Sequence, residues 1–278
     1  MFWFTQGLCS LPVFLVIWSS STFIISYLIA IFRHDVDVLF PYISDTGANP
    51  PESCIFGLMT FISSGAGIAT IYARYKFVEK LSEETRVVSP RLNKAALVLG
   101  VVSCLSMCIV ATFQETTVTE VHDLGALLFF VSGVLYIVVQ SVVSYHAYPY
   151  GSSAGVCRAR LGIAVVAALA FFPSILPKKK EKKRKVEMLW FLLCEHARRA
   201  FNQDATLGSR MIPAVVCAFF VHQTRLHRDR EDQDYPFHVA SAVCEWVVAF
   251  SFVCFFLTYI DDFKMFTLRV KTEFEELS

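Results

Sequence analysis

The chain has 278 residues, of which 55% are hydrophobic and only 18% are charged, and its mean hydropathy is +0.52. Soluble domains usually carry about 25% charged residues, so this composition excludes an ordinary soluble globular protein. The net charge of +1 gives no reason to expect nucleic acid as a partner. The nine cysteines are scattered and form no Cys-x-x-Cys pair, so we expect no disulfide framework, metal site or other cofactor.

Five segments are long and apolar enough to cross a bilayer as single helices, which requires roughly 20 residues each. They are residues 11–32, 54–75, 95–113, 124–145 and 237–260. The first segment is too long for a signal peptide, and no Lys or Arg precedes it. We therefore expect a retained helix and predict an all-α polytopic membrane protein whose main partner is the lipid bilayer.

The basic residues indicate which loops are cytoplasmic, because Lys and Arg near membrane helices mostly stay on that side. The second predicted loop and its border contain Arg74, Lys76, Lys80, Arg86, Arg91 and Lys94. The fourth loop contains Arg158 and Arg160, and the tail contains Lys264, Arg269 and Lys271. The first loop has only Arg33, and the third has no basic residue. This alternation predicts that both termini are cytoplasmic, which requires an even number of spans, and six transmembrane helices fit best.

One of the six predicted spans, the fifth, is interrupted. Residues 160–173 and 214–221 are each too short to cross alone, but together they amount to roughly 22 residues, the length of one span. Residues 174–213 lie between them and contain a basic run at 178–185. We interpret this stretch as an insertion, since its removal restores a normal helix. The alternatives are a real loop that binds anionic lipid and a nuclear import signal.

Glu245 is an ionisable residue in the middle of the last predicted span, where such residues are costly and therefore suggest a function. His238, Ser241 and Glu245 fall on one helical face. One interpretation is a proton relay or ion site, which would make the chain a proton-coupled transporter or channel. The other is a protonated or hydrogen-bonded Glu245 that fixes helix packing.

His122 and Asp123 lie at the mouth of the fourth predicted span, on the predicted non-cytoplasmic side. If that side is an acidic lumen, His122 would be protonated and would sense pH, because histidine changes charge close to neutrality. A simpler role for Asp123 is that of an acidic residue favoured by the dipole at a helix N-terminus.

The first predicted loop is the most distinctive part of the chain, with Pro41-Tyr-Ile-Ser-Asp-Thr-Gly47 followed by Asn-Pro-Pro-Glu-Ser53. Its Asp-Thr-Gly and Asn-Pro-Pro steps favour turns. Asp45 also stands in an aspartic-protease-like triplet, but that chemistry needs two such motifs in a β-rich fold. The sequence contains no HExxH or P-loop motif, and we do not expect an enzyme.

Several segments together carry a recognisable pattern. They are Pro41-Tyr-Ile-Ser-Asp-Thr-Gly47, Pro50-Pro-Glu-Ser53, Tyr72-Ala-Arg-Tyr-Lys76, Asn93-Lys94, Leu97-Val-Leu-Gly100, Ile109-Val-Ala-Thr-Phe-Gln-Glu115, His122-Asp123, Glu245-Trp246 and Phe256-Leu-Thr-Tyr-Ile-Asp-Asp-Phe263. This pattern resembles the damage-regulated autophagy modulator family. It covers the chain apart from residues 174–213, and the short tail after Phe263 is more like the first, stress-inducible member than a paralogue with a longer tail.

The resemblance implies a six-helix protein of the lysosomal membrane that promotes autophagy, with a role in cell death for the stress-inducible member. The family has no established catalytic residues, so none is transferred to this chain. The expected partners are autophagy or lysosomal proteins, and the basic residues within 74–94 also suit anionic lipids. Tyr75-Lys-Phe-Val78 has the form of a tyrosine-based sorting signal. The proton-coupled transporter or channel that uses Glu245 is the alternative function.

Overall fold

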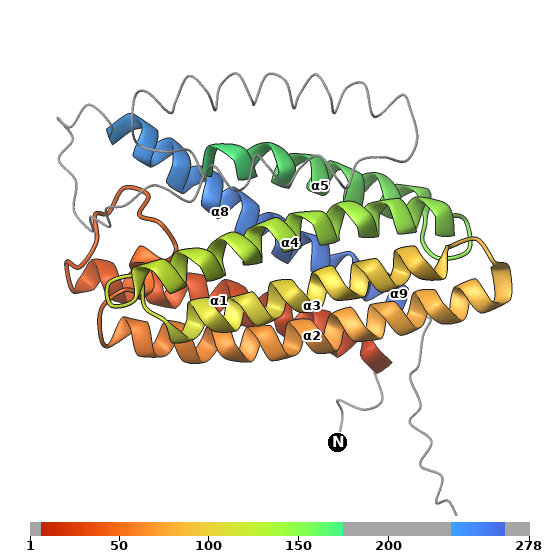
Figure 1. Ribbon diagram of the computed structural model, residues 1–278, viewed down its shortest axis with the longest axis horizontal. Helices are drawn as coiled ribbons and strands as arrows, with labels where there is room; N and C mark the ends of the chain where they lie inside the picture. Colours follow the sequence, from red (N-terminus) through yellow and green to blue (C-terminus); the bar gives the residue numbers. More distant parts are fainter. Residues whose placement is uncertain (1–6, 175–234, 265–278) are drawn as a thin grey trace, which may run out of the picture.

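The computed structural model describes residues 7–174 and 235–264 as a helical bundle without strands (Figure 1). Six helices in these ranges are long and apolar enough to cross a membrane. They are α1 (Ser10–Phe32), α2 (Glu52–Thr85), α3 (Pro90–Thr112), α4 (Thr119–Ala147), α5 (Ala154–Ser174) and α8 (Tyr235–Leu257). The short elements are α9 (Tyr259–Lys264) and the 3-10 turns η2 (Gly7–Cys9) and η3 (Asp45–Gly47). The predicted all-α fold with six spans is confirmed, and the sidedness of the termini stays a prediction.

The long helices lie side by side along the longest dimension of the bundle (Figure 1). Each helix from α1 to α5 packs against the next one in the chain, and α5 packs against α8. Helix α8 also packs on α1 and closes the bundle. This closure brings the described ends together, since α9 contacts η2 and the Cys9 thiol lies 3.6 Å from the Ile260 carbonyl oxygen. The N-terminal and C-terminal parts of the described chain therefore lie at the same end of the bundle, as an even number of membrane crossings requires.

The turn between α2 and α3 follows from its own residues. Arg86, directly after α2, takes a left-handed conformation with φ of 56° and donates its backbone N–H to the Ser82 carbonyl at 2.9 Å. A left-handed residue at this position ends a helix while satisfying one of its last carbonyl groups. Pro90 then occupies the first turn of α3, where a missing N–H is tolerated. Local sequence therefore explains this sharp reversal of the chain.

Small residues and hydroxyl groups hold α2 and α3 close together. A Cβ added to Gly57 would lie 2.6 Å from the Ala111 carbonyl oxygen, so only glycine fits this approach. The Ser64 hydroxyl donates to the Cys104 carbonyl at 2.7 Å between the same two helices. Such contacts are typical of membrane helices, because lipid tails provide no hydrophobic drive for their association.

Two observed helices differ from the predicted spans. Helix α2 runs to Thr85 rather than ending at Tyr75. Helix α5 begins at Ala154 rather than Arg160 and runs unbroken to Ser174, so it is long enough to cross without a second piece. The prediction treats Arg158 and Arg160 as loop residues and therefore makes this span too short. The segment 214–221, the basic run at 178–185 and the rest of the predicted insertion beyond residue 174 lie outside the described residues.

The segment between α1 and α2 turns back along the bundle instead of projecting from it. The Trp246 indole on α8 donates to the Pro41 carbonyl at 2.9 Å, and the Ser26 and Thr46 hydroxyl oxygens are 3.0 Å apart. Ser26 lies about 9 Å inside the end of α1, at a rise of 1.5 Å per residue. We call residues 38–48 the inward loop. Non-helical backbone at such depth requires a covering of protein, which α1 and α8 provide here.

Candidate functional site

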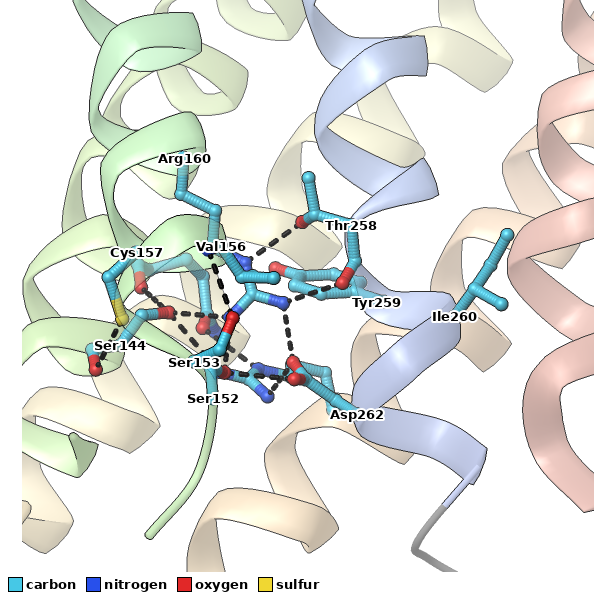
Figure 2. A network of polar contacts seen from close by, with 12 residues as sticks. Ser144, Ser152, Ser153, Val156, Cys157, Arg160, Thr258, Tyr259, Ile260 and Asp262 are labelled. Atoms are coloured by element: carbon cyan, nitrogen blue, oxygen red, sulfur yellow. Dashed lines mark hydrogen bonds and ion pairs between the residues drawn. The ribbon is translucent and has the colours of Figure 1, made fainter. Parts of the chain in front are cut away.

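Three charged side chains are buried together where α2, α5 and α9 meet. They are Arg74 on α2, Arg160 on α5 and Asp262 on α9, with exposed fractions of 0%, 0% and 2%. Arg74 Nη1 lies 2.6 Å from Asp262 Oδ2, and Arg160 Nη2 pairs with the same oxygen. Figure 2 shows Arg160 and Asp262 facing each other within a wider polar network. We call these three residues the arginine–aspartate cluster.

Every nitrogen of the Arg160 guanidinium has a partner (Figure 2). Nε donates to the Thr258 hydroxyl at 2.8 Å, and Nη2 donates to the Thr258 carbonyl at 2.9 Å as well as to Asp262. Nη1 donates to the Ser144 and Ser152 hydroxyl oxygens at 2.8 and 2.9 Å. One side chain of α5 is therefore fixed to α4, to the α4–α5 turn and to the end of α8.

Arg74 and Asp262 complete their hydrogen bonds with the same surroundings. Arg74 Nε donates to Gln140 Oε1 at 3.4 Å, and Nη2 donates to the Ser144 hydroxyl at 3.3 Å. The Ser152 hydroxyl donates to the second carboxylate oxygen of Asp262 at 2.8 Å. The cluster consequently joins α2, α4, α5 and α9, and each of its charged nitrogen and oxygen atoms has a partner.

An aromatic ring lies against both guanidinium groups. The Cζ atoms of Arg74 and Arg160 are 5.1 and 5.0 Å from the centroid of the Tyr259 ring. The Tyr259 hydroxyl is 2.8 Å from the Tyr136 hydroxyl, which ties the ring to α4. A cation over an aromatic face is attracted by the negative charge of the ring face. Tyr259 therefore stabilises a cluster whose single carboxylate faces two cations.

The charges of the cluster determine what it can do. Two guanidinium groups and one carboxylate leave one excess positive charge, and guanidinium groups stay protonated at physiological pH. All three side chains are buried and fully hydrogen-bonded, so they are placed to hold helices together rather than to carry out chemistry. Loss of one partner would leave a buried charge uncompensated, which is strongly unfavourable.

Sequence reasoning missed this cluster. It counted Arg74 and Arg160 among the loop cations, and that assignment is wrong, because both lie inside helices and are fully buried. The sequence did contain a sign of buried charge, because Arg74 and Arg160 each border an apolar run and Asp262 follows another apolar run. The basic residues still exposed or partly exposed on this side are Lys76, Lys80, Arg86, Arg91, Lys94, Arg158 and Lys264. The argument for cytoplasmic termini now depends on these residues.

Glu245 lies on α8 and is partly buried. The indole of its neighbour Trp246 donates to the Pro41 carbonyl at 2.9 Å, and Ala249 packs with Ile43 in a buried apolar cluster. The structure thus places the part of α8 that carries Glu245 beside the inward loop, a contact that the sequence did not reveal. The proton-relay interpretation stays a prediction.

The two predicted histidines occupy separate places at this end of the bundle. His238 lies near the start of α8, buried, with its ring edge-on to the Tyr42 ring at 4.9 Å. His122 is buried on α4, and its Nδ1 lies 2.7 Å from the Phe113 carbonyl oxygen. Its Nε2 has no hydrogen-bond partner among the described residues. A pH-sensing role for His122 stays a prediction.

The other predicted residues take structural positions. Helix α4 begins at Thr119 and has Glu120 in its first turn. The helix-dipole role therefore fits Glu120 better than Asp123, because the effect fades within one turn. Asp45 is buried in η3, with 4% of its surface exposed.

The predicted sorting signal is helical in the structure. The Tyr75 hydroxyl donates to Glu79 at 2.7 Å within α2. Val78, the last residue of the motif, is fully buried. In this conformation the valine side chain cannot reach a partner, although Tyr75 itself is partly exposed.

The segment Gly151-Ser-Ser-Ala-Gly155 has the Gly-x-Ser-x-Gly spacing of a serine-hydrolase nucleophile turn. That turn joins a strand to a helix, whereas this segment joins α4 to α5. The Ser153 hydroxyl accepts the Val156 backbone N–H at 3.3 Å and so caps the start of α5 (Figure 2). In the part of the chain that the structure describes, no group of three His, Cys, Asp or Glu side chains is placed to hold a metal ion.

Comparison with known proteins gives matches over nearly the whole chain. The family described as Frag1/DRAM/Sfk1/Cwh43P N-terminal domain matches residues 7–266. DNA damage-regulated autophagy modulator protein 1 from Mus musculus is 40% identical over 99% of this chain and 99% of its own length. DNA damage-regulated autophagy modulator protein 2 from Homo sapiens is 40% identical over 100% of this chain and 92% of its own length. No solved structure matches the chain.

A more distant relative also has a name that refers to autophagy. The modulator of macroautophagy TMEM150B from Danio rerio is 27% identical over 91% of this chain and 84% of its own length. The two modulator proteins have equal identity to this chain, but the chain covers more of the length of protein 1 than of protein 2. On these matches and on its six apolar helices, the chain belongs to the Frag1/DRAM family, within which it resembles the damage-regulated autophagy modulators.

Proposed function

We propose that this chain is a multi-pass protein of the lysosomal membrane that promotes autophagy, acting without catalysis through partner proteins and anionic lipids. The observation that carries the proposal is the nearly full-length match to proteins named as autophagy modulators. The same names refer to DNA damage, so the proposal includes a role in the stress response and in stress-induced cell death. The saturated hydrogen bonding of the arginine–aspartate cluster supports a structural rather than a catalytic use of the buried charges.

A surface suited to such partners lies at the α2–α3 turn. Helix α2 has 34 residues, about 51 Å at 1.5 Å per residue, whereas the hydrocarbon core is about 30 Å thick. Part of α2 therefore extends beyond the core and carries the turn with it. Arg86, Arg91 and Lys94 are exposed there. Such a basic patch attracts anionic headgroups if it faces the cytoplasm, as the sequence predicts.

The location is tested by imaging the full chain, tagged at its C-terminus, against a lysosomal marker, beside a version that lacks residues 174–213. Autophagic flux is measured in the same cells. We expect co-localisation with the marker and a raised flux. If only the shortened version reaches lysosomes, the segment is an aberrant insertion and the proposal holds for the rest of the chain. If neither version reaches lysosomes, the proposed function is wrong.

The role of the basic turn is tested by replacing Arg86, Arg91 and Lys94 together by glutamine. We expect the variant to reach lysosomes but to raise flux less than the unaltered chain. The matched control is Arg158→Gln, because Arg158 is exposed near the start of α5, at the bundle end where α2 finishes. An equal effect of both variants would contradict a specific role for the α2–α3 turn.

A second candidate, a proton-coupled transporter or channel, is favoured by one observation, the acidic side chain of Glu245 within a helix that is long and apolar enough to span a membrane. Glu245→Gln keeps the size of the side chain but cannot exchange a proton. If this variant promotes autophagy unchanged, proton transfer through Glu245 is not part of the function. If autophagic flux falls while localisation and protein level are normal, the result favours the transporter hypothesis over the first proposal.

A further inference from the structure

Contacts with two helices place the start of the inward loop inside the apolar part of the bundle. The Tyr27 hydroxyl donates to the Val38 carbonyl at 2.9 Å, and Tyr27 lies about 7.5 Å before the end of α1. Because side chains tilt toward the N-terminus of their helix, the Tyr27 ring points further inward. On α8, the residue that binds the Pro41 carbonyl is Trp246, about 12 Å from the start of the apolar span at His238.

The polar boundary of the bundle comes before this loop in the chain. Helix α1 has 23 residues, about 34 Å, which nearly matches a hydrocarbon core of about 30 Å. Its last residue, Phe32, is exposed, and the polar residues Arg33, His34 and Asp35 follow it and are exposed or partly exposed. The chain therefore reaches the polar surface at Arg33 and returns toward the apolar region by Val38.

Four side chains donate hydrogen bonds to carbonyl groups of the inward loop. The pairs are Tyr27 with Val38, Trp246 with Pro41, Thr46 with Ile43 and Thr116 with Ala48, at 2.7 to 2.9 Å. A carbonyl group without a partner is costly in hydrocarbon, so a non-helical segment can enter only where protein groups satisfy its backbone. The donors from α1, α8 and the α3–α4 connection help to meet this requirement.

The loop nevertheless presents three large apolar side chains outward. Val38, Leu39 and Phe40 have exposed fractions of 69%, 45% and 47%, whereas residues 41–48 are buried or partly buried. We call these three residues the apolar tip. Phe40 has a φ of 47°, a conformation that bulky side chains rarely adopt. The backbone is thus held in an unfavourable conformation at the residue that places an aromatic ring on the surface.

The apolar tip continues the lipid-facing side of α1. Ile17, Ile24 and Leu28 are exposed along one side of this spanning helix, and lipid tails are as apolar as such side chains. Tyr27, the neighbour of Leu28 in the helix, holds the Val38 carbonyl. The surface that contacts lipid on α1 therefore extends onto the tip.

We propose that the apolar tip is inserted among the acyl chains of one leaflet, at the end of the bundle opposite the arginine–aspartate cluster. The segment between α1 and α2 is then a re-entrant element rather than an aqueous loop. No polar side chain occurs between Val38 and Pro41, so acyl chains suit the tip better than headgroups or water do. The proposal holds for either orientation of the protein and is independent of the proposed function.

Photo-crosslinking of the full chain in phosphatidylcholine vesicles tests this contact. Phe40→p-benzoylphenylalanine keeps an aromatic side chain and adds a group that reacts with nearby C–H bonds on irradiation. We expect adducts on the lipid acyl chains, identified by mass spectrometry, in an amount similar to that from the same substitution at Ile24. The substitution at Glu84 should give none, because Glu84 is exposed near the end of α2, where the helix extends beyond the hydrocarbon core.

Three crosslinking results would overturn the proposal. Absence of adducts at position 40, in vesicles where position 24 gives them, would mean that the tip faces water. Adducts on the choline headgroup alone would place the tip at the membrane surface. A crosslinked product of twice the mass of the chain, in place of lipid adducts, would mean that a second copy covers the tip. None of these results depends on where the protein resides in the cell.

A carboxyl group introduced at the tip provides a second measurement. Leu39→Glu should lower the melting temperature of the vesicle-bound protein at neutral pH, relative to the unaltered chain at the same pH. The loss should shrink at acidic pH, because a protonated carboxyl group enters hydrocarbon more readily than a charged one. Thr117→Glu is the control, since Thr117 is exposed in the α3–α4 connection at the same end of the bundle, and any loss there should be equal at both pH values. A Leu39→Glu variant whose melting temperature is unchanged at both pH values would contradict insertion of the tip.

Discussion

Arg74 and Arg160 both donate to one carboxylate oxygen, Oδ2 of Asp262, so that helices α2 and α5 are joined through a residue near the end of the described chain. This arrangement is asymmetric. Each arginine has further partners on α4 or α8, whereas Asp262 is the single anion for both. The packing of the whole end of the bundle should therefore be most sensitive to the charge of Asp262.

Asp262→Asn should strongly destabilise the protein. The change keeps the shape of the side chain but leaves two buried guanidinium groups without an anion, and breaking a buried ion pair costs about 3–5 kcal/mol. We expect the apparent melting temperature of the full chain in detergent to fall by several degrees, as measured by size-exclusion chromatography after heating.

The neighbouring residue provides the control for this experiment. Asp261 carries the same group on α9, but its side chain is 67% exposed and pairs with Lys264 at 2.7 Å. Exposed pairs of this kind contribute little to stability, so Asp261→Asn should leave the melting temperature unchanged. Equal losses in the two variants would mean that the cluster is not the source of the effect.

Arg160→Lys should also destabilise the bundle, although it preserves the charge. A single ammonium group cannot reach Thr258, Asp262 and the serines of α4 and the α4–α5 turn together, as the planar guanidinium does. The melting temperature should fall, and Arg158→Lys is the matched control because Arg158 is exposed on the same helix. An unchanged melting temperature in Arg160→Lys would show that charge alone, and not the hydrogen bonds, holds α5 in place.

The six helices could be predicted because a membrane span is a local property of the sequence. Apolar runs of sufficient length identify α1, α2, α3, α4 and α8 directly. The fifth helix was predicted too short because an arginine beside an apolar run is usually a loop residue. Arg160 is an exception, since Asp262 takes up its charge inside the bundle. The partner that decides where α5 begins lies far away in the sequence.

The position of the inward loop could not be predicted from the sequence either. Its turn-forming residues between Pro41 and Ser53 are evident from the sequence, and so is the unusual Glu245 on the last span. Neither feature reveals the other, because the loop is held by the Trp246 indole and by apolar contacts with α8. Only the packing of α8 on α1 brings the loop and the helix that carries Glu245 together.

Trp246→Phe should loosen the inward loop while keeping its aromatic contacts. The variant loses the hydrogen bond to the Pro41 carbonyl, a contribution of about 1 kcal/mol, so hydrogen exchange in residues 38–48 should rise roughly fivefold. Trp18→Phe is the control, because the Trp18 indole donates to the Met59 carbonyl at the same 2.9 Å but holds α1 to α2. If both variants raise exchange in the loop equally, the Trp246 bond has no specific role there.

Gly57→Ala should separate α2 from α3. The added Cβ would meet the Ala111 carbonyl oxygen at 2.6 Å, and backbone on both sides leaves no flexible side chain to move away, so a loss of about 1–3 kcal/mol is expected. Gly65→Ala on the same helix is the control, because nothing lies within 4 Å of its added Cβ. Alanine also favours helix more than glycine, so Gly65→Ala should keep or slightly raise the melting temperature that Gly57→Ala lowers. A fall of equal size in both variants would mean that flexibility of α2, rather than its close approach to α3, is what these glycines provide.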